Sequence, residues 1–207
     1  MNNFVYYSID NLIIILLLLI TSICCRNIHL IIISILCFVF ILYFYRGWDN
    51  TIKNPKNNIL YCPCEGKILS IKKKKDHYHV AIFLNIHNIH VQYSPISGEL
   101  IKIKYKKGSF YPAYIFEKSN YNERMISYIK SKYGVIEFHQ IAGQLARRIE
   151  VFKKEGDQLN PLEPHGLIKF GSRCDLKIPI NNFILNSELI KDMPMQIGDI
   201  IGYYKNN

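Results

Sequence analysis

Two long apolar runs open the chain and set its first part apart from the rest. Leu12–Ile20, extended weakly to Cys25, and Ile28–Tyr45 are separated only by Arg26-Asn27. Neither run has a polar face, which disfavours core helices of a soluble domain. The second run and the absence of a basic start disfavour a cleaved signal peptide. The pattern predicts a membrane anchor over residues 1–48, a transmembrane helical hairpin turning at Arg26-Asn27.

The first run is shorter than the roughly 20 residues of a full span, so one longer tilted span with an interfacial segment is the alternative. Tyr43, Tyr45 and Trp48 then form an interfacial aromatic belt, followed by basic residues typical of a cytoplasmic flank. The polar residues 49–58 are the expected linker. We therefore expect a membrane location, integral or monotopic, with the body of the chain on the cytoplasmic face.

Residues 59–207 show short runs typical of β-strands, with Gly/Asp turns between them. Leu100–Tyr105 alternates apolar residues with lysines, as a half-buried strand does. We expect a mainly β domain, a β-rich barrel or sandwich with few short helices. Over Met125–Tyr133 the spacing also allows a helix. The other expected strands are Lys67–Ile71, Tyr78–Leu84, Met125–Lys130, Val135–Ile141, Leu145–Phe152, Leu167–Phe170 and Asp175–Ile180.

The formal net charge of the chain is +10, and residues 1–50 contribute none of it, because their two aspartates cancel their two arginines. A basic body suits an anionic partner, either a membrane surface or nucleic acid. We find no stacking motif or known nucleic-acid module, so nucleic acid is not expected. The six cysteines form no disulfide framework and no zinc pattern, which predicts a reducing compartment and no metal site. His77 and His79 would share a strand face, and we expect them to be exposed rather than metal ligands.

A Gly171-Ser172 step lies between two of the expected strands. Such a step can be a simple β-bulge, because glycine tolerates unusual backbone angles. It also suits self-cleavage, in which the Ser172 hydroxyl attacks the open Gly171 carbonyl and the chain then breaks, converting Ser172 into an N-terminal pyruvoyl group. Cleavage would leave a large fragment, residues 1–171, and a small fragment, residues 172–207.

The surrounding motifs favour self-cleavage. They occur in one order along the chain: Phe83–His90, Ser94–Gly98, Lys107–Phe110, Asn122–Arg124, Ile141–Ile149, Lys154–Asp157 and Gly166–Asp175. This series, from about Tyr45 to Tyr204, resembles the phosphatidylserine decarboxylase family, and most closely its short subfamily with a Gly-Ser-Arg cleavage triplet. Several ordered motifs are far more specific than one Gly-Ser pair.

The resemblance implies a lyase made as a proenzyme, with a covalent pyruvoyl cofactor derived from Ser172 that condenses with the substrate amine. The implied reaction converts phosphatidylserine to phosphatidylethanolamine at a phospholipid membrane. The implied partners are the lipid and the two fragments of the same chain, and a homo-oligomer is left open. The implied catalytic domain covers residues 59–207.

The resemblance also assigns further site residues. His90 matches the first histidine of the family's Asp-x-His element, so it is expected to move protons. Asn88 stands in place of that element's Asp, and Tyr93 stands where long members carry a second histidine. Glu65 replaces an Asp that in the family helps the serine to attack. We expect Glu65 and His90 to assist cleavage or decarboxylation, with His87 and Tyr93 as alternative proton carriers.

Other functions stay open on the sequence alone. Because Glu65 is one methylene longer than the usual Asp, the chain could be an uncleaved, non-enzymatic lipid-binding or adaptor relative of the family. The turns at Lys154–Asp157 and Ile197–Ile200 also suit a biotinyl- or lipoyl-type carrier barrel. A carrier needs an exposed lysine at its hairpin tip, and Met193–Met195 lacks one.

Overall fold

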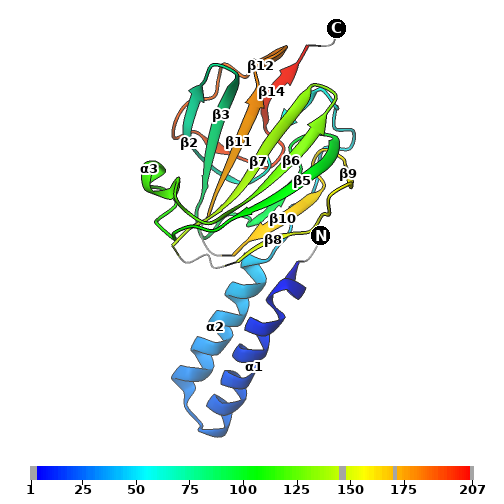
Figure 1. Ribbon diagram of the computed structural model, residues 1–207. Helices are drawn as coiled ribbons and strands as arrows, with labels where there is room; N and C mark the ends of the chain where they lie inside the picture. The colour runs from blue at the N-terminus through cyan, green and yellow to red at the C-terminus, as the bar shows by residue number, and fades with distance from the viewer. Residues whose placement is uncertain (1–3, 145–147, 170–171, 206–207) are drawn as a thin grey trace. The chain divides into compact units, whose positions relative to one another are not determined.

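The computed structural model describes residues 4–144, 148–169 and 172–205 (Figure 1). Within it the chain forms two compact units, Met1–Asp49 and Asn50–Asn207.

The first unit is a pair of short helices. After a 3-10 turn, Val5–Ser8, α1 covers Ile9–Cys24 and α2 covers Ile28–Phe44. Arg26 adopts a left-handed backbone conformation with φ 53°, and the Asn27 side chain accepts a hydrogen bond from the Leu30 amide. Both features end one helix and begin the next, because they place a turn and an N-cap inside the apolar sequence.

The predicted transmembrane hairpin is wrong. α1 has 16 residues and α2 has 17. Among the described residues, no helix combines the length and the apolar character needed to cross a membrane. The physical reason is the break at Arg26-Asn27, which divides the apolar residues between two helices that each fall short of a span of about 20 residues.

The second unit is built from antiparallel strands, as predicted. An eight-stranded sheet has the order β13-β2-β3-β11-β7-β6-β5-β9, and two three-stranded sheets have the orders β4-β10-β8 and β1-β14-β12. One short helix, α3, covers Phe116–Ser119. The strands are β1 Ile59–Tyr61, β2 Gly66–Lys73, β3 His77–Leu84, β4 Val91–Tyr93, β5 Gly98–Lys106, β6 Arg124–Ser131, β7 Gly134–Ala142, β8 Ile149–Val151, β9 Gln158–Leu159, β10 Pro164–Ile168, β11 Ser172–Pro179, β12 Phe183–Leu185, β13 Pro194–Met195 and β14 Ile200–Tyr204.

Most of the expected strands form. β2 and β3 make the predicted hairpin, and so do β6 and β7, which excludes the alternative helix over Met125–Tyr133. Gly134 closes the second hairpin with φ 124°, a conformation that other residues rarely adopt. The strand expected over Leu145–Phe152 is shorter, Ile149–Val151, and residues 145–147 lie outside the described part of the chain.

β11 lies in the middle of the large sheet, between β3 and β7 (Figure 1). Its side chains alternate between two faces. Cys174, Leu176 and Ile178 point into the main apolar core. Arg173 and Asp175 point to the opposite face and are also buried. β11 is therefore largely buried on both faces.

Candidate active site

Ser172 is the first residue of β11 and is held between two strands. It pairs with Leu84 of β3 and with Ala142 of β7. Its side chain is completely buried, and its Oγ has no hydrogen-bond partner among the described residues. A buried hydroxyl without a partner is costly, so such a group calls for an explanation. The predicted cleavage site also involves Gly171, which lies outside the described residues.

The sheet β4-β10-β8 packs on the inner face of the large sheet, and β10 runs alongside β7 there. The ring of His165 lies 5.2 Å from the ring of Phe138. One residue further along β10, Gly166 lies directly against the Gln140 side chain. Both strands therefore advance in the same direction, toward the end where Ala142 pairs with Ser172.

This arrangement brings His90 to the Ser172 end. The His90 carbonyl accepts a hydrogen bond from the Ile168 amide at 3.3 Å, so His90 lies beside the last residue of β10. Gln92 shares a face with His90, and its Oε1 accepts a hydrogen bond from Gln140 Nε2 at 2.8 Å. His90 lies two residues beyond that contact, in the direction of Ser172.

The His90 ring is buried and oriented by its own turn. Its Nδ1 lies 2.8 Å from the Asn88 carbonyl oxygen. Because a carbonyl can only accept, Nδ1 donates, and in the neutral ring Nε2 is then the acceptor. This tautomer leaves His90 able to receive a proton at Nε2.

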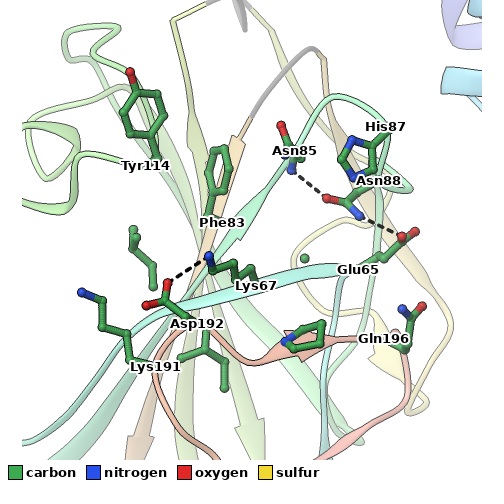
Figure 2. A pocket seen from close by; sticks show the side chains of 14 residues that line it. Glu65, Lys67, Phe83, Asn85, His87, Asn88, Tyr114, Lys191, Asp192 and Gln196 are labelled. Atoms are coloured by element: carbon green, nitrogen blue, oxygen red, sulfur yellow. Dashed lines mark hydrogen bonds and ion pairs between the residues drawn. The ribbon is translucent and has the colours of Figure 1, made fainter.

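Glu65 holds the same turn. Its Oε1 accepts a hydrogen bond from Asn88 Nδ2 at 2.8 Å (Figure 2), and its Oε2 accepts one from the Ile89 amide at 2.9 Å. The Asn88 carbonyl in turn receives the His90 Nδ1 proton. The geometry therefore links Glu65 to His90 through the backbone of the turn. Glu65 and His90, the two residues predicted to act together, are therefore connected, and the contacts of Glu65 hold the turn that orients the His90 ring.

Arg173, the residue after Ser172, is fully buried in a network that sequence reasoning missed. Its guanidinium uses all of its five N–H donors. Nε and Nη2 bind the two oxygens of Asp175, each at 2.7 Å. Nη1 donates to the Phe116 carbonyl at 3.0 Å and to Ser119 Oγ, and Nη2 also donates to Asn120 Oδ1 at 2.7 Å. The network ties the start of β11 to α3.

Asp175 is charged although it is buried. Burial alone would raise its pKa, but the hydrogen bond from His79 and the charge and hydrogen bonds of Arg173 lower the pKa to about 2. His79 Nε2 lies 2.8 Å from Asp175 Oδ2, so His79 belongs to this network. The spacing of Arg173 and Asp175 indicates a shared strand face. No sequence signal shows that this face is covered.

A second buried polar pair lies in the core, further along the sheet from Ser172. His165 Nε2 lies 2.8 Å from Ser127 Oγ, and both side chains are fully buried. Burial, and then the positive charge of Lys153, lower the pKa of His165 to about 4. His165 is therefore neutral at physiological pH. Its place beside Phe138 puts it away from the Ser172 end of β11.

A pocket of about 500 Å³ opens on the outer side of β2 and β3 (Figure 2). Its floor includes Phe83, which pairs with Arg173, and its rim includes Asn85, which follows the partner of Ser172. Lys67 lies in it and pairs with Asp192 at 3.1 Å. The other lining residues are Glu65, Gly66, Ile68, Leu69, His87, Asn88, Tyr114, Lys191, Pro194 and Gln196. The pocket is mixed in polarity, with two lysines, Lys67 and Lys191, and two carboxylates, Glu65 and Asp192.

Comparison with known proteins gives a consistent result. A family model described as phosphatidylserine decarboxylase matches residues 38–203. A putative archaetidylserine decarboxylase proenzyme of Methanococcoides burtonii is 36% identical over 140 residues, covering 68% of this chain and 64% of the relative. Phosphatidylserine decarboxylase proenzymes of Amoebophilus asiaticus and Solibacter usitatus are 36% and 38% identical over 156 and 142 residues. Those matches cover 72% and 69% of this chain, and 69% of each relative.

Proposed function

Because the chain belongs to the phosphatidylserine decarboxylase family, we propose that it converts phosphatidylserine to phosphatidylethanolamine, using a pyruvoyl group that it makes from Ser172 by cleaving itself after Gly171. The observation that carries this proposal is the buried Ser172 Oγ, which has no hydrogen-bond partner in the described part of the chain and lies at the start of a central strand. An inert structural serine would be expected to use its hydroxyl in a hydrogen bond.

Cleavage begins when Ser172 Oγ attacks the Gly171 carbonyl carbon and gives up its proton to a base. The Gly171–Ser172 C–N bond breaks, which leaves an ester on Oγ and a free amine on residue 172. A base then removes the α proton of residue 172, a Cα=Cβ double bond forms as the Cβ–Oγ bond of residue 172 breaks, and Gly171 leaves as a carboxylate. The enamine that remains tautomerises to an imine. Water hydrolyses the imine, ammonia leaves, and residue 172 becomes a pyruvoyl group. His90 Nε2, at this end of the sheet, is the proposed base.

A pyruvoyl group at this position supplies a carbonyl that draws electrons away from the substrate's α carbon as carbon dioxide leaves. Side chains of the protein would supply the proton transfer and bind the headgroup. His90 can return a proton to the substrate carbon, and Glu65 keeps the His90 turn in place through Asn88. In the adjoining pocket, where Lys67 is paired with Asp192, the ammonium group of Lys191 suits the phosphate of the headgroup.

The two fragments should remain one folded body after cleavage. All of β11 belongs to the small fragment, whereas its neighbours β3 and β7 belong to the large fragment. β13 and β14 of the small fragment also pair with β2 and β1 of the large one. We propose that these pairings hold the cleaved chains together until they are denatured. The location of the catalytic unit on the cytoplasmic face of a membrane stays a prediction, and so does the formation of a homo-oligomer.

The test is a denaturing gel and intact mass of the purified full chain, paired with carbon dioxide release from phosphatidylserine in mixed micelles. We expect two fragments, a blocked N-terminus on the small one, and carbon dioxide release that Ser172→Ala abolishes together with cleavage. A single full-length band after prolonged incubation would refute the proposal and favour the uncleaved lipid-binding alternative. Cleavage without carbon dioxide release from phosphatidylserine would refute the proposed substrate.

A further inference from the structure

Large aromatic side chains are displayed at the end of β5 and on the connection from β5 to β6. Tyr105, Tyr114 and Tyr121 are 55%, 59% and 73% exposed, and Phe110 and Tyr111 are exposed as well. We call residues 105–121 the aromatic segment. Exposed large apolar surface at this density on one short segment commonly marks an interaction site.

Hydrogen bonds from polar side chains fix the backbone of the aromatic segment to the sheet. The Asn122 side chain donates to the Tyr111 carbonyl at 2.7 Å and to the Ala142 carbonyl at 2.8 Å, and accepts from the Tyr111 amide at 2.8 Å. Arg124 donates to the Ser119 carbonyl at 3.2 Å, and Arg173 binds α3 as described above. The aromatic side chains therefore point outward from a well-anchored backbone.

Basic residues are the main charged neighbours of these rings in the sequence, although the Tyr105 hydroxyl donates to Glu123 Oε2 at 2.8 Å. Lys104, Lys106, Lys107 and Lys118 are exposed, and Glu117 is the only exposed acidic residue between positions 104 and 121. Tyrosine and tryptophan favour the interface between lipid headgroups and acyl chains, and lysines beside them are attracted to anionic headgroups. The chemistry of the segment matches an anionic bilayer surface.

The aromatic segment lies at the same end of the sheet as Ser172. It leads into Arg124, which pairs with Ile141, one residue before the β7 partner of Ser172. Tyr114 belongs to the segment and also lines the pocket beside β2 and β3 (Figure 2). A headgroup presented at the segment would therefore be next to the pocket mouth.

We propose that the aromatic segment is the surface by which the catalytic unit docks on an anionic phospholipid bilayer. The inference rests on the proposed function only in taking a phospholipid as substrate. The rings enter the interface, the lysines contact anionic headgroups, and Tyr114 connects the bilayer surface to the pocket.

The test uses a fluorescent reporter at one position of the full chain. Trp48 is the only tryptophan of the sequence, so a Trp48→Phe background is dark. Phe110→Trp places the reporter in the segment. Tyr203→Trp is the matched control, because Tyr203 is 44% exposed against 39% for Phe110 and adjoins Tyr204, which stacks on Tyr133 at the opposite end of the sheet. The probe is phosphatidylglycerol vesicles with brominated acyl chains.

We expect the Phe110→Trp reporter to shift to the blue and to be quenched by the brominated lipid, and the Tyr203→Trp reporter to change little. Replacing Lys106, Lys107 and Lys118 by Gln should raise the vesicle concentration needed for half-maximal quenching roughly a hundredfold, since each basic residue contributes a factor of about five to membrane affinity. The same change at Lys74, Lys75 and Lys132, which lie on turns at the opposite end, should have much less effect.

No quenching at Phe110→Trp, or equal quenching at both reporters, would overturn the docking surface. A response of the Phe110→Trp reporter to a single-stranded oligonucleotide but not to vesicles would overturn it in favour of a nucleic-acid partner. Carbon dioxide release from phosphatidylserine in mixed micelles is measured on the same protein preparations. Quenching without carbon dioxide release would refute the proposed function and leave the docking surface supported.

Discussion

Asp175→Asn removes the negative charge that balances the buried Arg173 guanidinium. Both side chains are almost completely inaccessible to solvent, with exposed fractions of 0% for Arg173 and 1% for Asp175. Removing one partner of a buried ion pair leaves the other charge unbalanced in a region of low dielectric constant. The measured cost of such a change is about 3–5 kcal/mol of unfolding free energy. We expect Asp175→Asn to fall in this range at pH 7.

The pKa of Asp175 sets the part of this stability that depends on pH. Folding lowers the pKa from 3.8 to about 2, which corresponds to about 2 kcal/mol. Because the pKa is lower in the folded protein, the unfolded chain takes up the proton first as the pH falls. This contribution is therefore fully present above about pH 4 and is lost as the pH falls toward 2. The Asp175→Asn variant should lack it.

The assay is urea unfolding in detergent, in a Ser172→Ala background so that every variant is a single chain. Lys177→Gln is the matched control, because Lys177 lies on the same face of the same strand and pairs with Glu137 at 2.8 Å. That pair is partly exposed, so its loss should cost less than about 1 kcal/mol. A cost for Asp175→Asn no greater than for Lys177→Gln would refute the interpretation of the network.

Three further outcomes are expected. Glu65→Gln should slow fragment formation, whereas Glu65→Asp should keep it. His90→Ala should lower the rate of carbon dioxide release even in cleaved molecules, by roughly a hundredfold to ten-thousandfold. A time course of fragment formation and of carbon dioxide release checks both. His165→Gln should flatten the pH dependence of unfolding between pH 6.5 and about 4, because the wild-type loses about 3 kcal/mol there as the unfolded histidine becomes protonated first; urea midpoints measured across that range would reveal an unchanged slope if it is wrong. Gly166→Ala should cost about 1–3 kcal/mol in the same urea assay, because a Cβ atom would lie 2.6 Å from Gln140 Nε2 and 2.5 Å from a backbone oxygen; a neutral effect would contradict the close packing of β10 on β7.

The sequence by itself determined the family and most of the strands. The family prediction is confirmed because its motifs occur in one order over most of the chain, which chance does not produce. The strands that form hairpins were predictable because alternation between apolar and polar residues is a local pattern, and because turn residues such as Gly134 carry their own signal. Ser172 was found from the Gly-Ser pair within those motifs.

Only the tertiary structure decided which polar residues are buried and what they contact. Arg173 and Asp175 look like surface charges in an alternating strand, and their burial depends on α3, which comes from a distant part of the chain. The placement of His90 near Ser172 depends on how β10 packs on β7. The transmembrane prediction failed on length: the turn predicted at Arg26-Asn27 forms, but the helices on either side have only 16 and 17 residues. Local patterns determine the elements, whereas contacts between distant residues determine the chemistry of the site.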